Sequence, residues 1–180
     1  MSVATDVLKH EHEAILLGLR ILDQIATRAK EGKVAPQDAI AFLAFLREFA
    51  DKCHHGKEEG FLFPEMIKSG LPQNSGPISV MLSEHEEGRA LIAAMAASAS
   101  PVMKGQEFAQ AAHAYITHLT AHIDKENHVL FPMADRMIRP EALEELAAAF
   151  ERHEEQVIGH GRHEELHDML KDLKKKYLAN

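Results

Sequence analysis

Residues 54–64, HHGKEEGFLFP, and residues 122–132, HIDKENHVLFP, are two copies of one motif. Both copies have histidine at the first place, lysine at the fourth, glutamate at the fifth and Leu-Phe-Pro at the end. A spacing of four residues places the histidine and the glutamate of each copy on one face of a helix, where both can bind the same metal ion. The prolines that close the two copies are expected to kink or end their helices just past these ligands. The predicted ligand pairs are His54 with Glu58, and His122 with Glu126.

A second repeated motif lies upstream of each copy. Glu11-His12-Glu13 lies in the first predicted helix, and Glu84-His85-Glu86 lies in the third. Each half of the chain thus supplies one lone histidine and one histidine–glutamate pair, which together suit a two-metal carboxylate site in a helical bundle. We expect the four glutamates beside the lone histidines to be surface charges, although one of them could orient an imidazole. The predicted metal ligands are His12, His54, Glu58, His85, His122 and Glu126.

Apolar residues recur with the period of an α-helix along the chain, and no segment alternates with the period of a strand. The pattern predicts an all-α fold, with an up-down four-helix bundle over about residues 3–136 and an additional C-terminal helix over about 140–178. Residues 69–77, SGLPQNSGP, form the clearest linker and divide the bundle into two halves. The ligand pairs fall within an apolar stripe, so we expect them to face the interior of one domain over residues 1–180.

Length, charge and cysteine content restrict the class of protein. The chain has 180 residues, enough for a domain with a core, and its net charge of −8 argues against a nucleic-acid partner. The single Cys53 is expected to be a small buried residue; it excludes an intrachain disulfide and suits a reducing compartment. We find neither a signal peptide nor a run of about 20 apolar residues, and therefore expect a cytoplasmic protein without a membrane partner.

Taken in order, these motifs resemble the hemerythrin-like, HHE cation-binding family. The resemblance covers roughly residues 5–135 and rests on two lone histidines and two histidine–glutamate pairs on successive helices. It implies a bundle that holds two non-haem iron ions bridged by Glu58 and Glu126, although manganese or zinc also suits imidazole and carboxylate ligands. It further implies that the protein binds, senses or reduces a small ligand, namely dioxygen, peroxide or nitric oxide.

Two departures from the family pattern bear on function. The oxygen-carrying members use five histidines, whereas the assignment above contains four, so the resemblance points to sensing or redox chemistry rather than reversible oxygen carriage. The iron-repair members carry an additional amino-terminal domain with a cysteine, and no counterpart is found in this sequence. An iron–sulfur repair role is therefore the less favoured expectation.

Other histidines could change the ligand set. His55 has the same spacing to Glu59 as His54 has to Glu58, and this is the main rival pair. The alignment with the second copy favours His54. His118 lies one turn before the histidine of the second copy, and we expect it to be solvated or to support a ligand rather than to bind metal.

Residues 163–167, HEELH, match a motif in which two histidines on one helical face bind zinc and the glutamate activates water. A metal-dependent hydrolase is therefore an alternative function, with His153 or His160 as the third ligand. No strand that could align a peptide substrate is predicted, and a helix rich in histidine and glutamate produces this motif easily by chance.

The C-terminal segment has simpler interpretations. It forms an amphipathic helix that packs against the bundle, or it docks a second copy of the chain or a partner protein. In the latter case the chain is a metal-stabilised interaction module in which iron is structural. A third interpretation is that Glu154, Glu155 or His163 closes over the open end of the metal site.

Replacing His54 and His122 together separates these hypotheses. If the repeated motifs form the metal site, the double variant His54→Ala, His122→Ala should lose its iron, because each half then lacks one ligand. Metal analysis of the purified variant measures this loss. If the HEELH segment forms the site, the same variant should keep its zinc and its hydrolase activity.

Overall fold

The computed structural model describes residues 2–159 and 161–178, and within these residues all regular structure is helical. Segments labelled η are π-helical turns within longer helices. The elements are α1 (Val3–Lys30), α2 (Pro36–Phe45), η1 (Leu46–His55), η2 (Glu58–Leu62), α3 (Phe63–Lys68), α4 (Gly76–Ala99), α5 (Gly105–Lys125), η3 (Glu126–Leu130), α6 (Phe131–Met137), α7 (Pro140–Val157) and α8 (Arg162–Leu178). None of the helices in the described ranges has the length and apolar composition that a membrane span requires.

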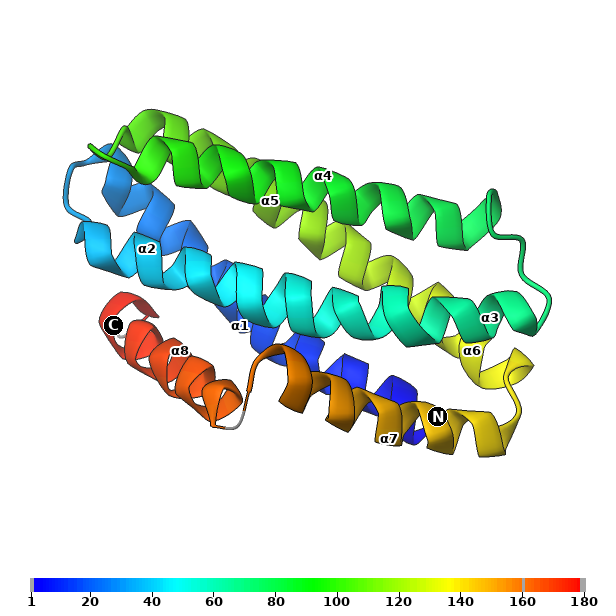
Figure 1. Cartoon of the computed structure of the whole chain (residues 1–180). Coiled ribbons are helices and arrows are strands. Elements are labelled where there is room, and N and C mark those ends of the chain that lie inside the picture. The colour runs from blue at the N-terminus through cyan, green and yellow to red at the C-terminus, as the bar shows by residue number, and fades with distance from the viewer. Residues whose placement is uncertain (1, 160, 179–180) are drawn as a thin grey trace.

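Four long helical stretches form an up-down bundle (Figure 1). The first and third are α1 and α4. The second runs without a break from α2 through η1 and η2 to α3, and the fourth runs from α5 through η3 to α6. The all-α class and the four-helix bundle predicted from periodicity are therefore confirmed.

The apolar core is divided into two clusters. The larger is built around residues such as Phe45, and the smaller around residues such as Phe63. Along α1, Leu8 belongs to the smaller cluster and Ile15 to the larger, while His12 lies buried between them. Each fully buried large apolar side chain contributes roughly 1.5–3 kcal/mol to folding. The two clusters thus hold a polar layer in the middle of the bundle.

Each proline of the repeated motif follows a π-helical turn. Pro64 comes after η2, and Pro132 comes after η3. A proline lacks the N–H that an α-helix would use at that position, and the π turn changes the hydrogen-bond pattern just before it. The prolines were expected to kink or to end their helices. The second of these expectations is wrong, because the helices continue past Pro64 and Pro132 in α3 and α6.

The C-terminal extension is confirmed, and it consists of two helices along one side of the bundle (Figure 1). The turn between α7 and α8 includes Gly159 and Gly161, whose φ angles of 89° and 81° are rarely adopted by other residues. α7 packs on α1 and on the η1–η2 stretch, and α8 packs on α1 and α2. The apolar side chains of α8 join the larger cluster, as expected for an amphipathic helix against the bundle. They are Leu166, Leu170, Leu173 and Tyr177.

Gly105 tests how closely α1 and α5 approach each other. A Cβ at Gly105 would lie 2.0 Å from the backbone oxygen of Ala29. Because backbone cannot rotate away, Gly105→Ala should lower the free energy of unfolding, measured with urea, by roughly 1–3 kcal/mol. Gly60→Ala is the matched control, since beyond its own helical turn no described atom lies within 4 Å of the added Cβ. The control should leave stability unchanged or raise it by up to about 1 kcal/mol; equal losses in both variants would contradict the prediction.

Candidate metal centre

The polar layer in the middle of the bundle contains two adjoining groups of buried side chains that can bind metal. Within each group, one nitrogen or carboxylate oxygen per residue lies within 4.8 Å of the others. Glu58 belongs to both groups, and all four helical stretches contribute. The first group consists of His12, His54, Glu58 and Glu126, and the second of His55, Glu58, His85 and His122.

In the first group, two imidazoles face each other. His12 Nε2 lies 2.9 Å from His54 Nε2. The same His12 nitrogen lies 3.2 Å from Glu126 Oε2, while His54 Nε2 lies 3.8 Å from Glu58 Oε1. The ring of Phe131 stacks on His12 with 5.4 Å between ring centroids. Nitrogen and oxygen atoms thus converge on one point against an apolar wall.

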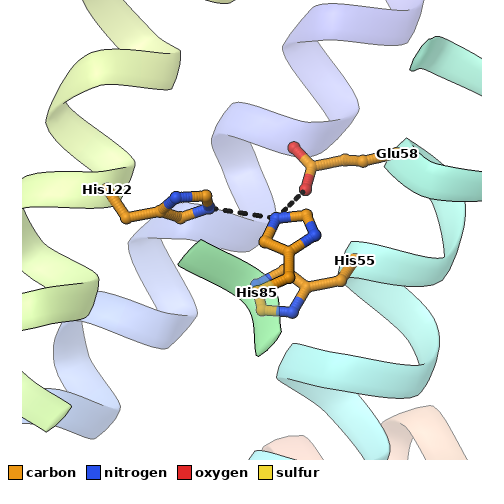
Figure 2. Close-up of side chains that lie close together, drawn as sticks. All are labelled: His55, Glu58, His85 and His122. Atoms are coloured by element: carbon orange, nitrogen blue, oxygen red, sulfur yellow. Dashed lines mark hydrogen bonds and ion pairs between the residues drawn. The ribbon is translucent and has the colours of Figure 1, made fainter. Parts of the chain in front are cut away.

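The second group repeats this arrangement with one more histidine (Figure 2). His85 Nε2 lies 3.2 Å from His122 Nε2 and 3.4 Å from Glu58 Oε2. His55 stacks on His85 with ring centroids 3.9 Å apart. Phe63 stacks on His85, the other lone histidine, with ring centroids 5.8 Å apart. The phenylalanine of each Leu-Phe-Pro motif therefore supports one lone histidine.

The two carboxylates each reach both groups. Glu126 Oε2 lies 3.2 Å from His12 Nε2 in the first group, and Glu126 Oε1 lies 3.1 Å from His122 Nε2 in the second. The Oε1 and Oε2 atoms of Glu58 lie 3.8 Å and 3.4 Å from an imidazole of the first and second group, respectively. Each glutamate has one oxygen beside each group, as a carboxylate bridge between two metal ions requires.

Several of these donor atoms have no hydrogen-bond partner among the residues that the structure describes. Both oxygens of Glu58, both oxygens of Glu126 and Nδ1 of His55 are buried without one. Each unsatisfied buried polar group costs about 1–3 kcal/mol. Such a concentration at one point is typical of a metal site, and imidazole with carboxylate suits iron, manganese or zinc.

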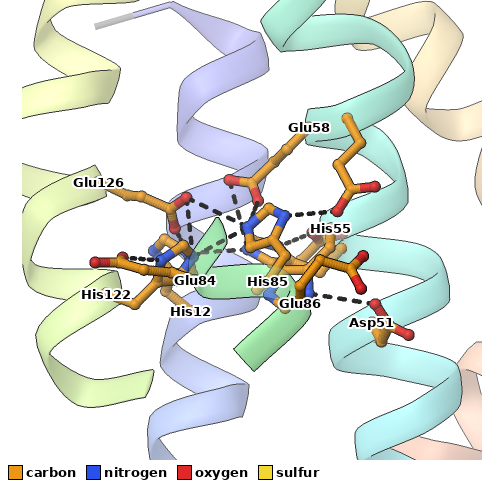
Figure 3. A network of polar contacts seen from close by, with 12 residues as sticks. His12, Asp51, His55, Glu58, Glu84, His85, Glu86, His122 and Glu126 are labelled. Atoms are coloured by element: carbon orange, nitrogen blue, oxygen red, sulfur yellow. Dashed lines mark hydrogen bonds and ion pairs between the residues drawn. The ribbon is translucent and has the colours of Figure 1, made fainter. Parts of the chain in front are cut away.

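Four of the five imidazoles donate Nδ1–H to an oxygen outside the two groups. Figure 3 shows one of these contacts, between His122 and Glu84. Carboxylate and amide oxygens accept hydrogen bonds, so Nδ1 carries the proton and Nε2 keeps its lone pair. His55 Nδ1 instead lies 3.4 Å from Asp51 Oδ1. The four pairs are His12 with Asn127 at 2.9 Å, His54 with Glu11 at 2.8 Å, His85 with Glu59 at 2.7 Å and His122 with Glu84 at 2.8 Å.

In these tautomers the facing Nε2 atoms both present lone pairs, so the distance between them shows whether a cation belongs there. The lone pairs of His12 and His54 meet at 2.9 Å, and those of His85 and His122 meet at 3.2 Å. Two lone pairs at such distances repel each other unless a cation or proton lies between them. The donor atoms present therefore fit a metal ion in each group.

The lysines of the repeated motif hold the acids that orient the imidazoles. Lys57 donates to Glu11, and Lys125 donates to Glu84. Glu11 and Glu84 are the first residues of the two Glu-His-Glu motifs. The repeat in the sequence thus appears in space as a ligand, an acceptor and a counter-charge in each half.

Burial and neighbouring charges shift the pKa values of the centre in different directions. Burial and the nearby Glu126 carboxylate raise the pKa of Glu58 well above its ordinary value. Burial also acts to raise the pKa of Glu126, but the imidazoles of His12 and His122 hold it well below its ordinary value. Burial lowers the pKa of His54 to about 4. Burial therefore favours the protonated form of Glu58 in the metal-free centre, whereas a bound metal ion would favour the carboxylate.

All six predicted ligands lie at this centre, and the structure adds His55, which the comparison of the two copies had set aside. η1 ends at His55. A π-helical turn contains more residues than an α-helical turn, which lets adjacent histidines both face the interior. With His55 the centre has five imidazoles, so the contrast with the five histidines of oxygen carriers no longer holds. The sequence signals for His55 were its position next to His54 and its four-residue spacing to Glu59.

The acids around the centre correct another expectation. Glu11 is only 6 % exposed and Glu84 is half-buried, so neither is the surface charge that we predicted. Glu13 and Glu86 are exposed, as expected. His118 belongs to neither group; its Nε2 donates to the carbonyl oxygen of Glu84 at 2.8 Å.

The HEELH segment lies on α8 outside both groups. His163 and His167 contact Phe49, with ring centroids 5.5 Å and 5.3 Å apart. Within residues 2–159 and 161–178, neither belongs to a set of three side chains close enough to bind one metal ion. His153 Nε2 donates to a backbone oxygen of η1, and His160 lies outside the described residues. The described geometry favours a packing role for this segment over a zinc site.

Comparison with known families agrees with this geometry. Residues 3–134 match the family described as Hemerythrin HHE cation binding domain. The chain belongs to the hemerythrin family. All seven side chains of the two groups lie within the matched region, whereas α7 and α8 lie beyond it. Family membership implies a metal-binding protein whose metal is iron.

Curated relatives include the "Iron-sulfur cluster repair protein YtfE" of Escherichia coli O1:K1 and that of Escherichia fergusonii. Each is 38% identical over 107 residues, which cover 55% of this chain and 48% of the relative. The chain therefore spans about half the length of the curated relatives it matches. No solved structure matches it.

Asn127 tests the contacts that orient the imidazoles. Its side-chain oxygen accepts from His12 Nδ1 at 2.9 Å. Asn127→Leu removes that acceptor, so the affinity for ferrous iron should fall about 10- to 100-fold, measured by competition with a chelator. Asn74→Leu, in the exposed loop after α3, is the control and should keep the original affinity. Equal affinities in the two variants would show that Asn127 does not support the centre.

Proposed function

We propose that the chain is a non-haem di-iron protein that binds, senses or reduces a small ligand such as dioxygen, peroxide or nitric oxide. The observation that carries this proposal is the pair of adjoining ligand groups with two buried carboxylates between them: Glu58 belongs to both groups, and Glu126 has one oxygen beside a histidine of each. Membership in the hemerythrin family favours iron among the ions that this donor set can bind. The proposed ligands are His12, His54, His55, Glu58, His85, His122 and Glu126.

The two proposed metal positions differ in how many imidazoles the chain supplies. The first has His12 and His54, whereas the second has three histidines. Glu58 belongs to both groups, and Glu126 lies beside His12 of the first and His122 of the second. The position with fewer protein ligands leaves more coordination sites for a small molecule, so we place ligand binding there. Two ferrous ions, when bound, would supply two electrons to a single small oxidant.

The chain provides the surroundings that such chemistry needs. Leu62 and Leu130, from the two Leu-Phe-Pro motifs, are 0% and 1% exposed and keep water away from the centre. The two shared carboxylates offset part of the metal charge. The carboxylate and amide oxygens that accept from Nδ1 hold four of the imidazoles in the tautomer that directs Nε2 at the metal.

Repair of iron–sulfur clusters is a second candidate function, favoured by the match to relatives that carry this name. The match covers about half of their length, so we propose that an iron centre is what the chain shares with them. Transfer of iron from the loaded protein to an apo iron–sulfur protein would test this candidate separately. The hydrolase alternative gains no support from the described residues around His163.

We further propose that the chain acts as one domain in the cytoplasm. The buried, unpaired thiol of Cys53 suits a reducing compartment. The apolar face of α8 packs into the same core cluster as α1 and α2, which supports one folding unit.

Metal content with an absorption spectrum tests the proposed function. Protein loaded with ferrous iron without oxygen should contain two irons per chain, and exposure to air or peroxide should change its visible spectrum. Two irons with no spectral response would support a structural metal in an interaction module instead. One zinc per chain and no visible bands would overturn the di-iron proposal.

A further inference from the structure

Lys57 is a buried cation held between carboxylates from two helices. Its side chain is 1% exposed. Nζ donates to Glu11 Oε1 and lies 2.7 Å from Glu154 Oε2. Glu154 belongs to α7, outside the region that matches the family. The C-terminal extension therefore contacts the layer of charges that surrounds the metal centre.

These contacts lead directly to one proposed iron ligand. While Glu11 Oε1 accepts from Lys57, Glu11 Oε2 accepts from His54 Nδ1 at 2.8 Å. A continuous polar path thus runs from Glu154 through Lys57 and Glu11 to His54. His54 belongs to the first group, which has only two imidazoles.

A third metal ion is not needed to explain this cluster. Glu11, Cys53 and Glu154 also lie within 4.8 Å of one another through one atom each. The ammonium group of Lys57 contacts both of the carboxylates, however, and already supplies their positive charge.

The other half of the centre lacks this second carboxylate. Lys125 is the counterpart of Lys57 in the repeated motif and donates to Glu84, which accepts from His122. In the described parts of the chain, Lys125 meets no further carboxylate, and its side chain is 41% exposed. The buried carboxylate–lysine–carboxylate arrangement is therefore specific to the two-histidine side.

We propose that Glu154 is a positioning residue for the two-histidine metal position, and that α7 tunes this position through Lys57, Glu11 and His54. This inference rests on the proposed di-iron function and adds the extension to it. Glu154 does not touch the metal ligands itself. It acts by fixing the charge and the place of Lys57.

The physical reason is competition for Glu11. A buried ammonium with one carboxylate partner would draw that carboxylate strongly towards itself, because unpaired buried charge is costly. The second carboxylate, from Glu154, shares the ammonium and leaves Glu11 Oε2 to accept from His54. Removing the negative charge of Glu154 makes the surroundings of the first metal position more positive, whereas removing the charge of Lys57 makes them more negative.

An ion pair that only fastens α7 to the bundle is the alternative, and the sign of the effects separates the two. In the iron-loaded protein, Glu154→Gln should raise the reduction potential, because a more positive environment favours the reduced ions. Lys57→Met should lower it. At a fixed applied potential, each single variant should change the ratio of reduced to oxidised centre about tenfold. For a one-electron couple this is equivalent to a shift of about 59 mV. The double variant should return close to the original potential.

Glu155→Gln is the matched control, since Glu155 is the exposed neighbour of Glu154 on the same helix. Potentials are measured by spectroelectrochemistry, and the rate of iron loss to a chelator is measured on the same samples. We expect the Glu154→Gln variant to release iron from the two-histidine position several-fold faster than the Glu155→Gln variant. Thermal unfolding of the metal-free variants shows whether each one folds.

The outcomes separate this inference from the proposed function. Opposite shifts in the two single variants, with recovery in the double variant, support it. Two bound irons with equal potentials and release rates in Glu154→Gln and Glu155→Gln overturn it and leave the di-iron function standing. Shifts of the same sign in Glu154→Gln and Lys57→Met also overturn it, since they indicate a general loss of structure. If Lys57→Met does not fold, the comparison of Glu154→Gln with Glu155→Gln decides alone. Absence of iron from the unmodified protein overturns both.

Discussion

Two carboxylates in the middle of the bundle set the main constraint on this structure. Glu58 and Glu126 are completely buried, and within residues 2–159 and 161–178 none of their oxygens has a hydrogen-bond partner. Burying such groups is costly unless a cation meets them. The apolar clusters on either side, the facing imidazoles and the layer of acids and lysines follow from the need to hold positive charge at this point. Burial of the apolar side chains in the two clusters offsets the free-energy cost of burying the polar layer between them.

The centre is two-fold in outline and asymmetric in detail. Each half supplies a lone histidine, a histidine–glutamate pair, an acid for Nδ1 and a lysine for that acid. The asymmetry comes from His55, which has Ile123 as its counterpart, and from Glu154, which contacts Lys57 of the first half. One metal position therefore has more imidazoles, and the other has the carboxylate–lysine–carboxylate arrangement beside it. Such a difference suits a centre in which one ion is held firmly and the other meets a ligand.

The sequence predicted the bundle and six of the centre's seven side chains, because helical periodicity and a duplicated motif are local patterns. His55 was missed because the alignment of the copies assumes symmetry, and the π-helical turn that brings it inward has no simple sequence signal. Glu11 and Glu84 were taken for surface charges because their partners, His54 and His122, lie on other helices. Glu154 is 97 residues from Lys57, so its role depends on how α7 folds back. Contacts between distant helices are what the sequence alone does not specify.

Iron anomalous scattering from crystals of the iron-loaded protein tests the central claim most directly. The account predicts two peaks in the middle of the bundle, one bound by His12 and His54 and the other by His55, His85 and His122. Both should be bound by Glu58 and Glu126. A single peak, or a peak at His163 and His167, would contradict the account.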